Sequence, residues 1–183
     1  MIYPNGDVYQ GEWEDNESNG YGIFVPFDKS SILKGYWEDG KLNGKGFEKF
    51  PDGSYYRGDF KDGVKEGEGT FVWEDGSTYT GGIANNQLHG KGIYEYDNGN
   101  VFEGKFTISL MYNIPSPIGE YLNNEMNGEG TFKYNDGREY KGEYKNNQRN
   151  GYGEYKWSDG KLYKGGWKEG KQHIVITKKG LLY

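Results

Sequence analysis

The chain has 183 residues, of which 33% are hydrophobic, 17% are aromatic and 32 are glycine. Frequent glycines oppose helix formation, which excludes helical bundles and doubly wound α/β folds. Disordered chains are poor in aromatic residues, so the high aromatic content excludes disorder. A formal charge of -6 disfavours nucleic acid as the main partner, and the absence of cysteine excludes disulfide scaffolds and thiolate zinc sites. No apolar run reaches the length of a membrane span. We therefore expect an all-β, cytoplasmic protein with a small core of rings packed on glycine backbone.

A repeat of 23 or 24 residues runs along most of the chain. The glycine of an aromatic-x-Gly triplet, or of a variant of it, marks the copies at Gly11, Gly35, Gly58, Gly81, Gly104, Gly119, Gly142 and Gly165. A Gly-x-Gly follows most of these glycines, and most copies close on an Asn-Gly or Asp-Gly pair, which favours a tight turn. Repetition of this kind predicts stacked supersecondary units.

Each copy has the residue alternation of two β-strands. In one copy Tyr56, Gly58 and Phe60 alternate with polar residues, and the glycines and rings from Gly67 to Trp73 do the same. A period of two places the rings and glycines on one face of a sheet. We therefore expect a hairpin in each copy, with rings of one hairpin lying over the bare glycine backbone of its neighbour.

The segment from Tyr140 to Gly160 resembles a MORN (membrane occupation and recognition nexus) repeat, and about eight partial or complete copies cover nearly the whole chain. With this resemblance, the alternation predicts tandem β-hairpins that form an elongated, twisted, solenoid-like ribbon of a single sheet. We expect one array over residues 1–183.

The pattern changes at three places in chain order. Residues 1–8 have the form of the end of an earlier copy, so we expect either a fragment or an edge that pairs with another chain. The short fifth copy, residues 102–117, lacks a Gly-x-Gly, and its stretch 107–117 is interpreted as a kink or spacer, with a partner-docking bulge as the alternative. Residues 174–183 are expected to form a terminating cap.

Charge is distributed unevenly along the chain. Residues 138–183 hold 11 Lys and Arg against 5 Asp and Glu, a net of +6, so the rest holds 11 against 23, a net of -12. This asymmetry favours self-association or an acidic partner, an accidental asymmetry of a solvated surface being the alternative. The expected contacts to an anionic partner are Lys156, Lys161, Lys164, Lys168 and Lys171.

No catalytic or metal-binding constellation is visible in the sequence. The two histidines, His89 and His173, have no companion ligand at metal-binding spacing. The carboxylates are spread over every copy and form no isolated pair for acid and base roles. We therefore expect no enzymatic activity, no cofactor and no metal.

The function that best fits a ring-rich repeat sheet is a non-catalytic scaffold that binds a segment of a partner protein. The resemblance to MORN proteins implies a cytoskeletal, ciliary or membrane-associated assembly. Phosphoinositide or membrane-surface binding is the second hypothesis, and a regulatory repeat region of a larger enzyme is a further one. The candidate partner-binding residues are Trp13, Trp37, Phe60, Trp73, Tyr94, Tyr96, Leu110, Met111, Tyr112, Tyr134 and Trp157.

Overall fold

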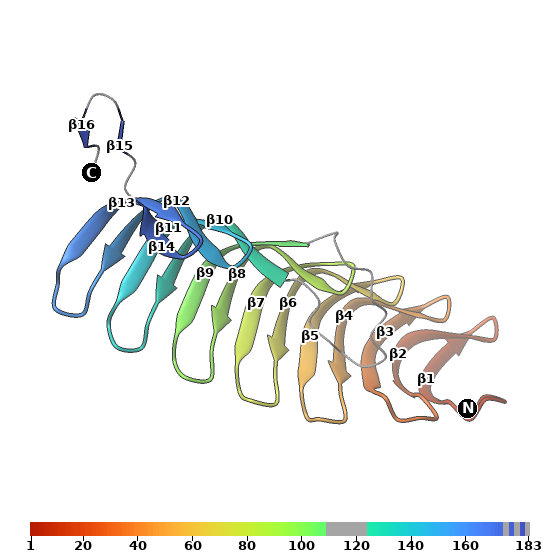
Figure 1. The fold of residues 1–183 in the computed structure, drawn as a ribbon. Coiled ribbons are helices and arrows are strands. Elements are labelled where there is room, and N and C mark those ends of the chain that lie inside the picture. The colour runs from red at the N-terminus through yellow and green to blue at the C-terminus, as the bar shows by residue number, and fades with distance from the viewer. Residues whose placement is uncertain (109–123, 174–175, 178–179, 182–183) are drawn as a thin grey trace.

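The structure, a computed structural model, describes residues 1–108, 124–173, 176–177 and 180–181. Fourteen strands form one antiparallel sheet in which each strand pairs with the next along the chain (Figure 1). Their bounds are β1 Val8–Glu14, β2 Glu17–Val25, β3 Ile32–Glu38, β4 Lys41–Lys49, β5 Tyr55–Lys61, β6 Val64–Val72, β7 Thr78–Ala84, β8 Gln87–Glu95, β9 Val101–Ile108, β10 Asn124–Lys133, β11 Glu139–Lys145, β12 Gln148–Lys156, β13 Leu162–Lys168 and β14 Lys171–His173. This part of the chain contains no helix that is long and apolar enough to cross a membrane.

The sheet is a row of hairpins set side by side, as Figure 1 shows. The expected all-β ribbon of a single sheet is thereby confirmed. Its fourteen strands make seven hairpins within the described ranges, one fewer than the glycine pattern indicates. The reason is that β9 and β10 pair with each other, with Gly104 opposite Gly130, and the sixth glycine start, Gly119, lies outside the described residues.

The Asp-Gly or Asn-Gly pairs that begin at Asp52, Asp75, Asn98, Asp136 and Asp159 lie in five-residue loops that join one hairpin to the next. Between β4 and β5, the Gly53 N–H donates to the Phe50 carbonyl at 3.1 Å, and the Ser54 N–H donates to the Asp52 carboxylate at 2.8 Å. Gly53 has a φ of 94°, a left-handed conformation that glycine adopts at little cost. The same side-chain bond recurs at Asp75, Asn98, Asp136 and Asp159.

Within six of the hairpins, two residues alone connect the strands. In the β5–β6 hairpin, Asp62 has a φ of 51° and Gly63 a φ of 81°, so both residues are left-handed. Two left-handed residues are the type I′ geometry, whose twist matches that of the flanking strands. Asn85 and Asn86 make the same turn without a glycine, with φ of 50° and 64°.

A tyrosine ring covers the glycines of its own hairpin. Tyr56 fills the space above Gly58 and Gly69, which lie directly opposite each other in β5 and β6, and a Cβ on either glycine would collide with the ring. The Tyr56 hydroxyl then donates to the Asp59 carbonyl at 3.1 Å. The same placement recurs with Tyr9, Tyr79 and Tyr140, and with Phe102, which has no hydroxyl to donate.

The expectation that rings cover the glycines of a neighbouring copy is therefore wrong for these rings. A side chain that leans along its own strand reaches the glycine two residues further on, and that glycine is paired with another across the hairpin. The second copy is the exception, since Leu33 stands at the tyrosine position and Phe60 of the next hairpin reaches over Gly46.

Neighbouring hairpins are joined by bonds beyond the strand ladder. The Trp37 indole N–H of β3 donates to the Gly22 carbonyl of β2 at 3.2 Å. At the two-residue turns, the Gly63 N–H donates to the Leu42 carbonyl of the preceding hairpin at 2.9 Å, and equivalent bonds recur at Gly40, Asn86, Asn147 and Gly170. Each hairpin is thus bonded to its neighbours along the array, which is the nearest-neighbour pattern of a repeat protein.

One ion pair lies among the rings. Glu48 occupies a position where other copies carry a ring, and it pairs with Lys65, with only 13% and 10% of the two side chains exposed. The Lys65 ammonium also lies 5.4 Å from the centre of the Phe50 ring and 5.6 Å from that of Tyr56. The structure thus gives Glu48 a partner within the chain.

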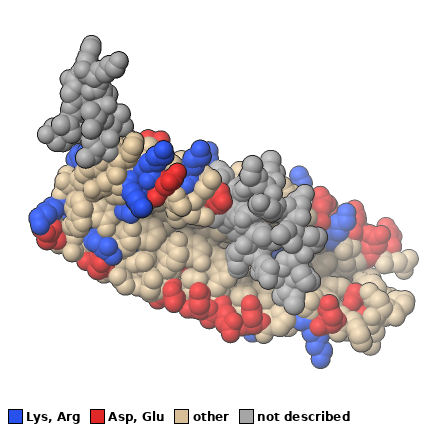
Figure 2. All heavy atoms as spheres, viewed as in Figure 1, with Lys and Arg blue, Asp and Glu red and all other residues tan. Residues whose placement is uncertain are grey.

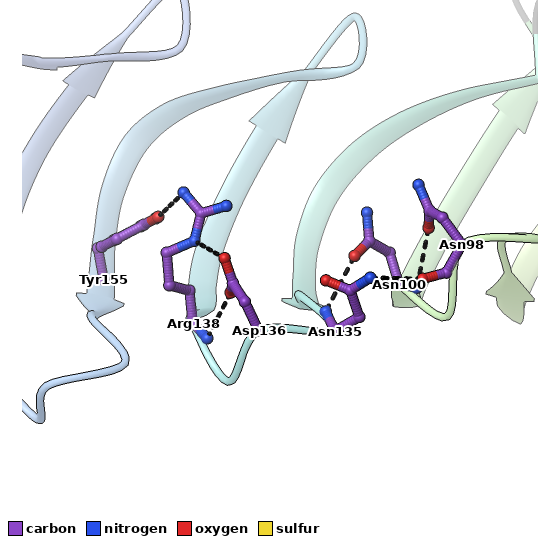
Figure 3. A network of polar contacts seen from close by, with 6 residues as sticks. All are labelled: Asn98, Asn100, Asn135, Asp136, Arg138 and Tyr155. Carbon is purple, nitrogen blue, oxygen red and sulfur yellow. Dashed lines mark hydrogen bonds and ion pairs between the residues drawn. The ribbon is translucent and has the colours of Figure 1, made fainter.

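The irregular β9–β10 hairpin is flanked by two loops that bond to each other, shown in Figure 3. The Asn135 side-chain amide donates to the Asn98 carbonyl at 2.6 Å, and the Asn135 N–H donates to the Asn100 side chain at 2.9 Å. Beside them the Arg138 guanidinium donates to Asp136 at 2.7 Å and to the Tyr155 hydroxyl at 3.3 Å. These bonds hold the five-residue loops together on both sides of this hairpin.

Two expected features fall largely outside the described residues. Residues 109–117 of the expected spacer or docking bulge are not described. Of the expected cap at 174–183, β15 (Ile176–Thr177) and β16 (Gly180–Leu181) pair as a separate two-stranded sheet.

Candidate partner-binding face

The two faces of the fourteen-stranded sheet differ in what their side chains contact. We call the face that carries Tyr56 and Phe60 the ring face, and the face that carries Tyr36, Phe47 and Arg57 the open face. The two sets alternate along the strands, so each hairpin contributes to both faces. The rings on the ring face are largely buried, although the sheet is a single layer, because they pack on glycine and on one another.

A chain of ring contacts runs along the ring face from the loop after β4 to the loop after β12. Its neighbours lie between 4.5 and 6.3 Å apart, centre to centre, from Phe50 and Phe71 at one end to Tyr155 and Trp157 at the other. Five candidate partner-binding residues belong to this chain and are partly buried in it: Trp73, Tyr94, Tyr96, Tyr134 and Trp157. The structure thus brings these five together in one row.

The other candidate rings have separate positions. Trp13 is partly buried against Tyr9, whereas Trp37 and Phe60 are buried with 8% and 4% exposed. Trp37 and Phe60 are therefore used in packing between hairpins and offer a partner almost no surface. Leu110, Met111 and Tyr112 lie outside the described residues.

Burial affects the ionisation of the tyrosines on this face. Burial raises the pKa of Tyr140 to about 12, and Arg149 nearby partly opposes that shift. The pKa values of Tyr56, Tyr79 and Tyr144 are also raised, in each case mainly by burial. These phenols therefore stay neutral in the folded chain, and those of Tyr56, Tyr79 and Tyr140 donate to backbone carbonyls.

The open face carries a hollow of about 1180 Å³ over β2–β7, which we call the first hollow. Tyr21 and Tyr36 face each other across β2 and β3 with ring centres 5.4 Å apart. Tyr21 is 44% exposed and Tyr36 is 59% exposed. A second ring pair, Phe47 and Tyr55, lies across β4 and β5 at 5.6 Å. Aromatic surface is therefore accessible here at two neighbouring places.

Cations surround these rings. The Lys34 ammonium lies 5.8 Å from the centre of the Tyr21 ring. Lys45 pairs with Asp59 at 2.7 Å, and this bond is the main cause that holds the pKa of Asp59 below its usual range. Arg57 lies exposed on the same surface, and Glu68 is the carboxylate that lines the hollow.

A second hollow, of about 430 Å³, lies on the open face over β10–β12. Its lining carries Glu129, Glu143 and Glu154 against Lys141, with Tyr152 exposed at 55%. Glu154 is paired with Lys164 of β13 at 2.7 Å. The two hollows thus occupy the same face and have charges of opposite sign.

The expected basic surface is present near the end of the array, but it is partly neutralised. Lys161 pairs with Asp159 at 2.9 Å and Lys164 with Glu154, a bond that raises the pKa of Lys164. Lys168 and Lys171 lie opposite each other in β13 and β14, and Lys156 is exposed on β12. Figure 2 also shows acidic side chains gathered along the edge of the array where the five-residue loops lie.

The described ranges contain no candidate metal site. No group of three or more His, Asp or Glu side chains lies close enough there to hold a metal ion. His89 and His173 are both exposed and lie on different hairpins.

The sequence pattern did not indicate the open face. Its residues differ from copy to copy, so the repeat pattern gives them no mark. The available signal was the pairing register, because Lys34, Phe47 and Arg57 fall opposite one another once the glycines of neighbouring strands are aligned.

A family model for the MORN repeat matches residues 9–25, 34–55, 56–78, 79–101, 118–137, 140–161 and 163–173. The chain belongs to the MORN repeat family. The MORN matches cover most of the seven hairpins. Residues 102–117, between the matches at 79–101 and 118–137, are unmatched, and they include most of β9 of the irregular hairpin. A comparison with curated protein sequences gives no match.

Solved structures similar to this MORN array include the TCP domain of SAS-4 (dCPAP) from Drosophila melanogaster, in complex with a proline-rich motif of Ana2 (dSTIL). It has 10% identity and a TM-score of 0.48, over 98% of this chain and 83% of that one. A mutant TCP10 domain of Danio rerio CPAP has 13% identity and a TM-score of 0.35, over 91% and 81%. The wild-type TCP10 domain of Danio rerio CPAP, in complex with a STIL peptide, has 14% identity and a TM-score of 0.19, over 89% and 95%.

Proposed function

We propose that this MORN array is a protein-interaction scaffold that binds a segment of a partner protein along its sheet. The observation that carries the proposal is the first hollow, where the exposed rings of Tyr21 and Tyr36 adjoin Lys34 and Arg57. Exposed tyrosines supply large contact area at low entropic cost and are enriched at protein interfaces. The partly buried row Trp73, Tyr94, Tyr96, Tyr134 and Trp157 is proposed as a further contact surface on the ring face.

The setting of the scaffold is a finer part of the proposal. The resemblance to MORN proteins suggests a cytoplasmic, cytoskeletal, ciliary or membrane-associated assembly. Membrane-surface binding through the basic end ranks second, since two of the five candidate lysines are already paired with carboxylates. Self-association remains a proposal supported by the charge asymmetry of the chain.

Crosslinking mass spectrometry in cells tests the scaffold. We expect crosslinks from Lys34 and Lys45, at the first hollow, to a recurrent protein partner. The double variant Tyr21→Ser/Tyr36→Ser should lose these crosslinks while its melting temperature stays the same, because both rings are exposed. Leu162→Ser, at a side chain 52% exposed on β13 and away from both hollows, is the matched control. Equal crosslinking by the double variant and the wild type would overturn the proposal.

A further inference from the structure

We propose that the first hollow binds a partner segment in the left-handed polyproline II conformation that carries a carboxylate at every third residue. This inference rests on the proposed scaffold function and specifies the chemistry of its ligand. Three properties of the hollow support it: the sign of its charge, the spacing of its cations and the spacing of its ring pairs.

The charge of the hollow is opposite to that of the chain around it. Three cations, Lys34, Lys45 and Arg57, line the hollow with the carboxylate of Glu68, and Lys45 is paired with Asp59, so three cations stand against two carboxylates. Residues 1–84 as a whole carry 8 Lys and Arg against 16 Asp and Glu. A local positive surface within an acidic region attracts an acidic segment and directs it to this place.

The spacing of the cations fits one class of extended chain. Lys34 lies opposite Phe47, and Phe47 lies opposite Arg57, so the two cations are two strands apart with a ring between them. Two strand spacings amount to about 10 Å. A polyproline II helix has three residues per turn and a rise of about 3.1 Å per residue, so every third side chain points the same way at intervals of about 9 Å. In a β-strand, by contrast, residues i and i+3 point to opposite sides.

The ring pairs have the same period. Tyr21 and Tyr36 lie across β2 and β3, and Phe47 and Tyr55 lie across β4 and β5, again a shift of two strands. Polyproline II segments dock on aromatic-lined grooves, and their carbonyls are free to accept hydrogen bonds. The exposed tyrosines, with Lys34 and Arg57, supply donors for those carbonyls and for the carboxylates of the segment.

Fluorescence anisotropy with three labelled twelve-residue peptides tests the ligand chemistry on the whole chain. The probe consists of four Pro-Pro-Glu units, and the comparisons are four Pro-Pro-Lys units and four Gly-Ser-Glu units. We expect saturable binding of the first peptide, at least tenfold weaker binding of the flexible acidic peptide, and no binding of the basic one at the first hollow. Equal affinity for the two acidic peptides, or tighter binding of the basic one, would overturn the inference.

Variants place the binding on the sheet. The double variant Lys34→Glu/Arg57→Glu should weaken binding of the Pro-Pro-Glu peptide at least tenfold without a change in melting temperature, since both side chains are exposed. Lys141→Glu is the matched control, because Lys141 is exposed on the open face but lies in the second hollow. It should leave the affinity within about twofold of the wild type. A loss with Lys141→Glu as large as that with the double variant contradicts the assignment.

The inference and the scaffold function fail in different ways. If crosslinks to a protein partner depend on Tyr21 and Tyr36 but the Pro-Pro-Glu peptide does not bind, the scaffold stands and the ligand chemistry is wrong. If phosphatidylserine vesicles bind the chain through Lys34 and Arg57 and the peptide does not, the hollow is a site for membrane anions and the inference is overturned.

Discussion

The ring face and the open face are made by the same strands, but they obey different constraints. On the ring face, Tyr56, Tyr79 and Tyr140 occupy one position in their copies and make one set of contacts. On the open face, the residues that follow these tyrosines by one are Arg57, Thr80 and Lys141, two long cations and a small neutral residue. The difference teaches that the repeat specifies the fold through one face and leaves the residues of the other free to differ between copies.

The largest effect is expected where the ring face contains a charge. Glu48→Leu removes the partner of Lys65 and leaves a nearly buried ammonium unpaired, which should lower the free energy of unfolding by about 3 kcal/mol. The double variant Glu48→Phe/Lys65→Leu should recover most of that loss, because neighbouring copies carry Phe71, Leu42 and Leu88 at these positions. Urea denaturation of the single and double variants measures both values, and a double variant as unstable as the single one contradicts the account.

The next largest effect is expected at a glycine under a ring. Gly58→Ala places a methyl group against the Tyr56 ring and should cost about 2–3 kcal/mol by overpacking. Gly63→Ala is the control, since its φ of 81° imposes a backbone cost of about 1 kcal/mol, whereas an added Cβ there has open space. Thermal denaturation compares the two variants, and an equal loss at both positions would show that ring packing adds nothing.

A smaller effect is expected from the tyrosine hydroxyl. Tyr79→Phe removes the bond to the Gly82 carbonyl, 2.8 Å long, and should cost about 1 kcal/mol. The ring itself is retained, and Phe102 shows that a copy folds without the hydroxyl. Chemical denaturation gives the value, and a loss as large as that of Gly58→Ala would contradict a purely hydrogen-bonding role.

The smallest effect is expected in the loops, which belong to neither face. Bonds from the side chain and backbone of residue i+2 hold the pKa values of Asp75, Asp136 and Asp159 below their usual range. A depressed folded-state pKa contributes stability above the unfolded pKa of about 4, and this stability is lost as the pH falls through the folded value. Replacing the three with Asn, the residue already present at Asn98, should flatten the fall in melting temperature as the pH drops below about 4. An unchanged acid profile would show that these bonds are too weak to matter.

The sequence carried enough information for the fold because the ring face is periodic. Glycines and rings at a spacing of two determine the strands and their inner side, and the Asp-Gly and Asn-Gly pairs that close most copies locate the loops between hairpins. The other turns were missed because their sequences vary, as Asn85-Asn86 and Glu169-Gly170 show, although each pair has two left-handed residues. A search for Asn, Asp or Gly at two adjacent positions midway between the longer loops would have detected most of them.

Other features depend on contacts that a one-dimensional pattern does not contain. Glu48 and Lys65 are 17 residues apart in the sequence, and only the pairing of β4, β5 and β6 brings them together. The parity of Tyr56 and Gly58 gives their common face but not the direction in which the ring leans. The first hollow required the register of several strands at once, which is why its residues were absent from the candidate set.

The chain of ring contacts also has an optical consequence. Its neighbouring rings lie 4.5 to 6.3 Å apart and include both tyrosines and tryptophans. At such distances, the excitation energy of a tyrosine is transferred to a nearby tryptophan before the tyrosine can emit. The folded array should therefore fluoresce almost entirely as tryptophan, although it holds 18 tyrosines and only 5 tryptophans. A tyrosine band that grows as hairpins open would report, without any label, how far the array has come apart.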